Sequence, residues 1–567
     1  MTSSNPGNLV FNWTATFFRT LQQLGVQHVI ISPGSRSTPL TLAAATNKHF
    51  QKHVILDERS AAFTALGIGK ATNTPAVLIC TSGTAVANYY PAVIEARKSG
   101  VPIILATADR PPNRRATGAN QAIDQLKIFG DYPVFFHEVG EAGNSEEDLE
   151  RLEILGQQAF EASKNKRGPV HLNFPFRKPL EPDPKYLQTI STPDKKEQPD
   201  SDKTTYKETQ HLSDGLLNKI SKAQNPLIIV GPLAPGDNTD SIRAIAEKIN
   251  APIIAESNID SKHVIKQFSG FLRNEQNLEN LAPDLILRFG FQPTAKSIEI
   301  GLEQWNPVYH YHFASTHALQ NATLSEISSI PWFGRPIATD KIHSKNSDQW
   351  LNKWKETKSD YQEYANKQIT EESPLTDGHV YDHLTPQLTR DLFLMVSNSF
   401  PARDINLFGK QPTGIPLYLN RGTSGIDGIT STAFGLSLAL DKAGVLITGD
   451  LAFLHDSNAL LNQQKLKLPL VIIVINNSGG SIFRMLPIEQ HEKYFTDYFE
   501  TPQSVDIRQM VQAHDIPFHS IETFSELHDF SLQRWMRNSN NNGLSIIECK
   551  TDADASMKLR KKLWKYS

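Results

Sequence analysis

The stretch that decides the fold is GDLAFLHDSNALLNQQKLKLPLVIIVINNSGGSIF, residues 449–483. It predicts a strand that ends at Gly449-Asp450, then a helix, and then a second apolar strand that ends at Asn477. A right-handed crossover between parallel strands places two such strands side by side. The side chains of Asp450 and Asn477 should therefore meet at one edge of a sheet, although they are 27 positions apart.

The residue types at this edge favour a divalent metal site. One carboxylate, one amide and nearby backbone carbonyls are the oxygen ligands that Mg²⁺ prefers, together with phosphate oxygens and water. Gly449 and the pair Gly479-Gly480 let the backbone approach a ligand closely. The alternative is a helix N-cap at Asp450 and an ordinary Asn-Asn-Ser-Gly-Gly turn, each common by itself. Because both features follow strands at this spacing, we predict the metal site.

The rest of the chain repeats the pattern of apolar runs separated by helix-length segments. Such runs are typical of parallel sheets that are buried on both faces. We predict an α/β fold with three doubly wound domains over residues 1–180, 212–338 and 375–567. Residues 181–211 are rich in proline and charge and are predicted to be a linker. Residues 339–372 carry Trp and Tyr at helical spacing and are predicted to form a connecting helix.

Composition argues against several functional classes. The 57 Lys and Arg residues nearly balance the 60 Asp and Glu residues, which argues against a nucleic-acid partner. We find no apolar run long enough for a membrane span, and the first residues do not resemble a signal peptide. Cys80 and Cys549 both lie in apolar runs, so we expect two buried thiols and no disulfide. We therefore expect a cytoplasmic protein with no membrane partner.

Residues 449–483 resemble the diphosphate-binding motif of thiamine diphosphate enzymes. Other strings resemble one family of them, the 2-succinyl-5-enolpyruvyl-6-hydroxy-3-cyclohexene-1-carboxylate (SEPHCHC) synthases. These strings are SPGSRSTPL (32–40), TSGTAVANYYPAVIEA (81–96), TADRPPNRRATGANQAID (107–124) and NRGTSGIDGITSTAFG (420–435). The resemblance is strong in the first and third predicted domains and weak in the second. Acetolactate synthases and pyruvate decarboxylases share the GD…NN motif but lack SPGSRST and ADRPP.

This resemblance implies a thiamine diphosphate-binding fold and a transferase of menaquinone (vitamin K2) biosynthesis. Such an enzyme uses thiamine diphosphate with Mg²⁺ or Mn²⁺, removes CO₂ from 2-oxoglutarate and adds the remaining four-carbon unit to isochorismate by 1,4-addition. The family also implies a homodimer or homotetramer with active sites between subunits. Two alternatives stay open. One is another thiamine diphosphate-dependent 2-oxo acid decarboxylase or carboligase, and the other is a non-catalytic protein that retains the fold.

The resemblance also implies roles for individual residues around the cofactor. Glu58, at the start of a predicted helix, would contact N1′ of the aminopyrimidine ring and take part in catalysis together with Arg421. The metal would be bound by Asp450, Asn477 and Gly479, which also belong to the cofactor site. The other cofactor-binding residues would be Pro33, Ser82, Ile426, Gly449, Leu451, Gly480 and Ile482.

Both substrates of the family are dianions, so the site needs cations, and arginine binds carboxylates in a bidentate manner. The resemblance implies that the substrate-binding residues are Ser35, Arg36, Arg110, Asn120, Gln121, Lys296, Ser399, Arg403, Arg421, Ile482, Phe483 and Leu486. Solvated surface positions for the arginines and core positions for the apolar residues are the alternatives. The chain departs from the family pattern at one point, because Lys296 is followed by Ser297 where the family has a second basic residue.

Overall fold

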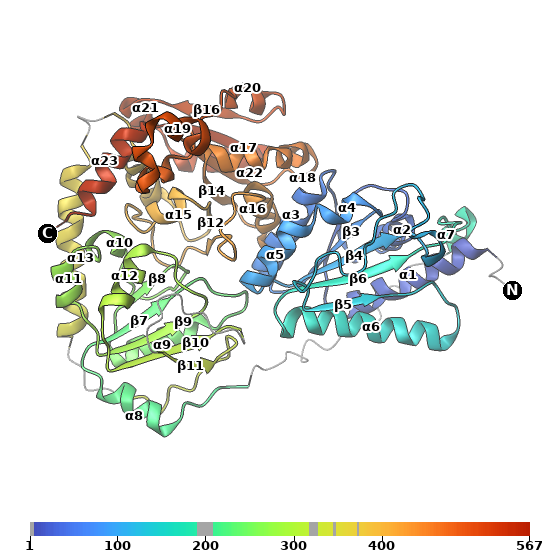
Figure 1. Cartoon of the computed structure of the whole chain (residues 1–567), viewed down its shortest axis with the longest axis horizontal. Helices are drawn as coiled ribbons and strands as arrows, with labels where there is room; N and C mark the ends of the chain where they lie inside the picture. Colours follow the sequence, from blue (N-terminus) through green and yellow to red (C-terminus); the bar gives the residue numbers. More distant parts are fainter. Residues whose placement is uncertain (1–4, 190–207, 317–326, 344–347, 371–373, 567) are drawn as a thin grey trace. The chain divides into compact units, whose positions relative to one another are not determined.

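The chain packs as two compact units. The computed structural model describes residues 5–189, 208–316, 327–343, 348–370 and 374–566. One unit comprises Met1–Tyr206 with Asp427–Asp441, and the other comprises Lys207–Ile426 with Lys442–Ser567. Among the described residues, no helix is both long and apolar enough to cross a membrane. Three parallel sheets, each with its own helices, confirm the predicted α/β fold (Figure 1).

The first unit is built on a six-stranded parallel sheet with the order β2-β1-β3-β4-β6-β5. Its strands are β1 (His28–Ile31), β2 (Gln51–Val54), β3 (Ala76–Cys80), β4 (Ile103–Asp109), β5 (Phe135–Glu138) and β6 (Pro169–Pro175). Strands β1, β3, β4 and β6 are buried along their whole length, since helices cover both faces of the sheet. One face packs against α1 (Pro6–Gln23), α2 (Thr38–Thr46) and α6 (Glu146–Asn165), and the other against α3 (Glu58–Thr72) and α5 (Tyr90–Ser99).

A helix from the C-terminal part of the sequence belongs to this first unit. Helix α16 (Ile429–Leu440) packs along α3, and a glycine on each helix allows the close approach. A Cβ atom on Gly435 would lie 2.0 Å from the carbonyl oxygen of Thr64, and one on Gly67 would lie 2.2 Å from that of Thr432. Both distances are shorter than van der Waals contact, so the backbones can meet in this way only at glycine. We did not predict this placement from the sequence.

The second unit contains the other two sheets, and all of their strand pairs are parallel. The middle sheet has the order β11-β10-β9-β7-β8, and the last sheet has the order β13-β12-β14-β15-β17-β16. The middle strands are β7 (Pro226–Val230), β8 (Ile253–Ala255), β9 (Leu285–Phe289), β10 (Tyr309–Ala314) and β11 (Ser328–Pro331). The last strands are β12 (Phe393–Val396), β13 (Leu417–Tyr418), β14 (Gly444–Gly449), β15 (Leu470–Asn476), β16 (Phe518–Ile521) and β17 (Ser545–Lys550).

Three strands were missed in the sequence, and all three lie at sheet edges. Strands β5, β11 and β16 are only partly buried and have no continuous apolar run, so the pattern that identifies central strands is missing from them. The apolar run HVILD predicts a strand over residues 53–57, but β2 begins at Gln51 and ends at Val54.

The predicted connecting helix is confirmed as α13 (Gln349–Gln368). Its buried residues Trp350, Trp354 and Tyr361 belong to a core that also includes residues of the middle and last sheets. The start of the predicted linker at 181–211 forms helix α7 (Pro184–Thr189), and residues 190–207 lie outside the described residues. Both cysteines are buried free thiols, as predicted.

The remaining helices are short and mostly connect strands. They are α4 (Thr84–Ala87), α8 (Asp214–Lys222), α9 (Thr239–Ile249), α10 (Phe268–Phe271), α11 (Glu275–Asn280), α12 (Lys296–Gln304), α14 (Asp377–Leu384), α15 (Phe400–Asp404), α17 (Asp450–His455), α18 (Gln463–Leu466), α19 (Glu492–Phe495), α20 (Ile507–Gln512), α21 (Phe524–Asp529), α22 (Leu532–Asn542) and α23 (Ala553–Leu563).

The close packing of α3 and α16 predicts the effect of one methyl group. Gly435→Ala should lower the free energy of unfolding by about 1–3 kcal/mol, because the new Cβ atom would force the two helices apart. Thermal unfolding of the full-length protein measures this change. Gly215→Ala in α8 is the matched control, since a Cβ atom there meets nothing within 4 Å. Equal melting temperatures for the two variants would contradict the packing described here.

Candidate active site

A cavity of about 330 Å³ lies in the second unit, and its walls include the ends of β14 and β15. Ligands of doubly wound sheets bind at the carboxyl ends of the strands, so the position of the cavity is that of a ligand site. It is lined by Asn398, Ser399, Phe400, Pro401, Arg403, Arg421, Ser424, Ile426, Gly449, Asp450, Leu451, Ala452, Asn477, Gly479, Gly480, Ser481, Ile482 and Phe483.

The register of β14 and β15 brings the predicted metal ligands to the same wall. Gly449 pairs with Ile475, so both strands end at the same level of the sheet. The Asp450 carboxylate accepts a hydrogen bond of 2.7 Å from the backbone N–H of Gly479. Asp450 and Asn477 are only 5% and 8% exposed. Burial raises the pKa of the Asp450 carboxyl to about 6, and the hydrogen bonds from the Leu451 and Gly479 backbones oppose that rise.

The side-chain amide of Asn477 is held in one orientation by its neighbours. Its Nδ2 donates to Asp377 over 3.1 Å, and the Ser481 hydroxyl donates to its Oδ1 over 3.1 Å. Asp377 is itself held, because it accepts hydrogen bonds from Thr551 (2.6 Å) and from the guanidinium of Arg560 (2.5 Å). We did not predict Asp377 or Arg560, which lie 100 and 83 positions from Asn477 in the sequence.

The two glycines of this wall differ in their surroundings. A side chain would not fit at Gly479, whereas space is open beside Gly449. Gly479 has a φ angle of +119°, and a Cβ atom there would lie 2.3 Å from the carbonyl oxygen of Glu500. A Cβ atom on Gly449, in contrast, would meet nothing within 4 Å. The main chain at Gly449 is therefore open to a ligand, while Gly479 fixes the turn that reaches the Asp450 carboxylate.

Arg403 lies on the wall formed by the short helix α15. Its Nη1 donates to the carbonyl oxygen of Ser399 over 2.8 Å, and Ser399 has the left-handed φ angle of 70°. Burial lowers the pKa of Arg403, while the nearby carboxylates of Asp404 and Glu256 raise it. Ser399 and Arg403, which were both predicted to bind substrate, are thus in direct contact.

Arg421 lines the cavity and is hydrogen-bonded to Asn398, a residue that we did not predict. Its Nη1 donates to Oδ1 of Asn398 over 3.0 Å. The Nδ2 of Asn398 donates to the carbonyl oxygens of Asn420 (2.7 Å) and Gly425 (2.6 Å). Asn398 therefore fixes both Arg421 and the loop that leads to Ile426. Its position just after β12 was the only signal in the sequence that could have identified it.

Two predicted residues of the second unit do not line the cavity. Lys296 forms an exposed ion pair of 2.8 Å with Glu299 on helix α12. Leu486 is 50% exposed. The cavity wall instead includes Phe400 and Pro401, which add apolar surface beside Arg403.

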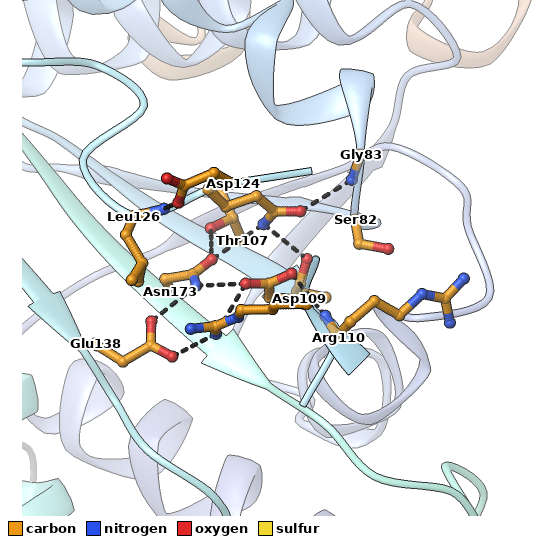
Figure 2. A network of polar contacts seen from close by, with 12 residues as sticks. Ser82, Gly83, Thr107, Asp109, Arg110, Asp124, Leu126, Glu138 and Asn173 are labelled. Atoms are coloured by element: carbon orange, nitrogen blue, oxygen red, sulfur yellow. Dashed lines mark hydrogen bonds and ion pairs between the residues drawn. The ribbon is translucent and has the colours of Figure 1, made fainter. Parts of the chain in front are cut away.

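The substrate residues predicted in the first unit lie in the loops that follow β1 and β4, and Ser82, which was predicted to bind the cofactor, follows β3. Figure 2 labels Ser82 and Arg110. Arg110 donates from Nε and Nη2 to the carbonyl oxygen of Asn120, over 3.0 and 2.7 Å. The Ser82 hydroxyl donates to the carbonyl oxygen of Gln121 over 2.9 Å. The structure thus brings the end of β3 together with the loop that contains Arg110, Asn120 and Gln121.

The loop after β1 carries three further predicted residues. Pro33 and Ser35 are exposed, whereas Arg36 is buried and donates from Nη1 to the carbonyl oxygen of Phe176 over 2.8 Å. The backbone N–H of Arg36 donates to the Thr81 hydroxyl over 3.3 Å, which ties this loop to the end of β3.

Glu58 is the first residue of helix α3, and Asp57 caps that helix. The Asp57 carboxylate accepts hydrogen bonds from the backbone N–H groups of Arg59 (2.8 Å) and Ser60 (3.3 Å). Glu58 is therefore free of the capping role that an acidic residue in a first turn often has. It is partly exposed, and the side-chain amide of Asn88 lies 3.5 Å from its Oε2.

Comparison with known proteins defines the class first. Residues 11–128 match the family model of the thiamine pyrophosphate enzyme N-terminal TPP binding domain, and residues 416–549 match that of the C-terminal TPP binding domain. The chain is therefore a thiamine pyrophosphate enzyme in its domain composition.

Relatives along the full length then define the family. A protein of Listeria monocytogenes serovar 1/2a (strain EGD-e) is 34% identical over 99% of this chain and 98% of its own length. A protein of Trichodesmium erythraeum is 34% identical over 97% and 96%, and one of Bacillus pumilus is 33% identical over 94% and 92%. All three are named 2-succinyl-5-enolpyruvyl-6-hydroxy-3-cyclohexene-1-carboxylate synthase. The chain belongs to this family.

Two glycines of the cavity wall, Gly449 and Gly479, should differ in how much a substitution lowers stability. Gly479→Ala should lower the free energy of unfolding by about 1–3 kcal/mol, because it combines strain at a positive φ angle with a clash against Glu500. Gly449→Ala should change it by less than about 0.5 kcal/mol, since it meets open space. Denaturant unfolding of both variants measures the difference. A stable Gly479→Ala protein would show that the turn is described wrongly.

Proposed function

We propose that this protein is a SEPHCHC synthase that depends on thiamine diphosphate. It would decarboxylate 2-oxoglutarate and add the resulting four-carbon unit to isochorismate, in the menaquinone pathway. The observation that carries the proposal is that the Asp450–Gly479 pair lines the same cavity as Ser399 and Arg403. This cavity offers oxygen ligands for a metal on one wall and a cation for a substrate carboxylate on another.

The residues of the cavity fit a diphosphate with a divalent metal. The Asp450 carboxylate, the Asn477 amide oxygen and the Gly479 carbonyl would hold Mg²⁺ or Mn²⁺, which bind such oxygen ligands together with phosphate oxygens. The open space beside Gly449 and the fixed turn at Gly479 support this fit. Oxygen atoms of the cofactor diphosphate would complete the coordination of the metal.

When bound, thiamine diphosphate would supply the carbon nucleophile and the electron sink that loss of CO₂ from a 2-oxo acid requires. The residues of the chain bind and orient the reactants. Arg403 and Ser399 would hold the distal carboxylate of 2-oxoglutarate, and Arg421 would lie near the reacting carbon atoms. Ile426, Ile482 and Phe483 would exclude water from that region.

Isochorismate would be bound by the first unit through the loops that follow β1 and β4. Arg36 and Arg110 would pair with its carboxylates, since arginine donates to a carboxylate in a bidentate manner. Ser35, Asn120 and Gln121 would donate the remaining hydrogen bonds. Glu58 would hold a proton at N1′ of the aminopyrimidine ring. We also propose that the protein is a cytoplasmic homodimer or homotetramer.

The main alternative is a related enzyme that joins other substrates. A decarboxylase with another acceptor would release CO₂ from 2-oxoglutarate at the same rate with and without isochorismate. The proposed synthase should release one CO₂ for each isochorismate consumed. Measurement of both quantities in one reaction separates the two functions, and a protein that binds the cofactor without any turnover would contradict both.

Removal of the Asp450 carboxylate should weaken cofactor binding that depends on metal. Asp450→Ala should raise the Kd for thiamine diphosphate in the presence of Mg²⁺ by about tenfold to a hundredfold, because an oxygen ligand of the metal is lost. Calorimetric titration of the full-length protein measures the Kd. Asp497→Ala, at an exposed position outside the cavity, is the matched control. An unchanged affinity in Asp450→Ala would show that the motif does not bind the metal.

Glu58→Gln should retain the fold and the oligomeric state but lose turnover by about a hundredfold or more, the usual contribution of a group that transfers a proton. Circular dichroism and light scattering check the fold and assembly, and steady-state kinetics measure kcat. Glu146→Gln, in the first turn of α6, is a control with a similar helix position. Near-normal turnover in Glu58→Gln would exclude the proposed role of Glu58.

A further inference from the structure

A buried polar network lies at the start of the loop that carries Arg110 (Figure 2). Its centre is Asn173 on β6, whose side chain has no exposed surface. The Asn173 Nδ2 donates to Asp109 over 2.9 Å and to Glu138 over 2.8 Å. Its Oδ1 accepts from Thr107 and from Gln125, each over 3.0 Å. The amide of Asn173 therefore makes four hydrogen bonds, which is its full capacity.

The network also contains two carboxylates, those of Asp109 and Glu138, and one cation, the guanidinium of Arg115. The Arg115 guanidinium lies 2.9 Å from the Asp109 carboxylate and 2.5 Å from that of Glu138. The two N–H bonds of Asn173 join the same two carboxylates. Burial raises the pKa of Asp109, while Asn173 and Arg115 oppose that rise. Asn173 and Arg115 therefore both contact, and both stabilise, the carboxylates of Asp109 and Glu138.

Two side chains of the network, Asp109 and Gln125, form hydrogen bonds with main-chain atoms of the surrounding chain. The Asp109 carboxylate accepts from the backbone N–H of Arg110 over 2.6 Å. Gln125 donates to the carbonyl oxygen of Ala108 over 3.2 Å, and its Oε1 accepts from the backbone N–H of Gly83 over 2.9 Å. The loop after β4 is therefore attached to the turn after β3 through Gln125, and Gln125 is attached to Asn173.

The attached loop has strained backbone that requires such support. Gln121 has a φ angle of 52° and Ala116 one of 55°, both in the left-handed region that residues other than glycine rarely adopt. Conformations of this kind persist only where the surroundings fix them. The carbonyl oxygen of Gln121 accepts from Ser82, and that of Asn120 accepts from Arg110. The side chains that would meet the substrate thus depend on a backbone that the network holds.

We propose that Asn173 is a positioning residue that fixes the isochorismate-binding loops through Asp109 and Gln125. It does not itself meet the substrate, because it is buried beneath them. This inference rests on the proposed function for the identity of the ligand. The attachment of the loops to Asn173 rests on the hydrogen bonds alone.

The test replaces the amide of Asn173 with a carboxylate of the same size. Asn173→Asp loses both N–H donors and places a third carboxyl beside Asp109 and Glu138, so the loops should open more often. Hydrogen exchange in segments 81–83 and 110–125 of the full-length protein should become about tenfold faster. The KM for isochorismate should rise about tenfold, the factor that corresponds to ~1.4 kcal/mol of lost binding. The KM for 2-oxoglutarate, whose predicted ligands lie in the second unit, should change by less than about twofold.

Two further variants complete the test: a milder change within the network and a control outside it. Thr107→Val removes one donor to Asn173 and should shift the same quantities in the same direction by a smaller factor. Asn462→Asp changes another buried asparagine outside the network and should shift none of them. If Asn173→Asp does not fold, Thr107→Val carries the test.

Three results would decide against part of the account. Unchanged exchange in segments 81–83 and 110–125 would show that Asn173 does not hold the loops. Faster exchange with an equal rise in the KM values for isochorismate and 2-oxoglutarate would show a general structural role and overturn the proposal. If the unaltered protein fails to consume isochorismate, the proposed function fails, while the exchange rates still decide whether Asn173 fixes the loops.

Discussion

The parallel pairing of β14 with β15 is the constraint on which the candidate active site depends. Gly449 pairs with Ile475, so Asp450 and the turn from Asn477 to Gly479 leave the sheet at the same level. The 2.7 Å hydrogen bond from Gly479 to Asp450 closes this edge. A slip in that register would separate the two strand ends and remove the proposed metal ligands from a common wall.

Buried polar clusters stabilise the second unit behind this edge. Arg560 of α23 has almost no exposed surface and lies between Asp377 and Asp404, at 2.5 Å from each carboxylate. Asp377 holds the Asn477 amide, and Asp404 belongs to the helix that carries Arg403. One guanidinium thus connects the proposed metal wall with the proposed carboxylate wall. Loss of one partner from such a cluster leaves a buried charge without compensation and is strongly destabilising.

The sequence was sufficient to predict the central strands and the edge at Asp450, because both have local signals. Apolar runs identify buried parallel strands, and Gly-Asp and Asn-Asn-Ser-Gly-Gly mark where two of them end. The edge strands β5, β11 and β16 lack such runs. The sequence of helix α16 is apolar and would be the same whichever unit the helix packed against. Only its contact with α3 in the structure assigns it to the first unit.

In the candidate site, too, residues with a local sequence signal were predicted, and residues whose partners are distant in sequence were not. Twelve predicted residues of the second unit line the cavity, whereas Lys296 and Leu486 of the same unit do not. Asn398 and Arg560 were missed because their partners are distant in sequence, and no spacing rule connects them. Asn173 was missed for the same reason, since its four partners come from three other segments of the chain.

The central claim is that Asp450, Asn477 and Gly479 hold a divalent metal against a diphosphate. Anomalous diffraction from crystals of the full-length protein with thiamine diphosphate and Mn²⁺ tests this claim most directly. We predict a manganese peak about 2.0–2.3 Å from oxygen atoms of all three residues and of the diphosphate. A peak at another position, or bound diphosphate without metal at this edge, would contradict the account.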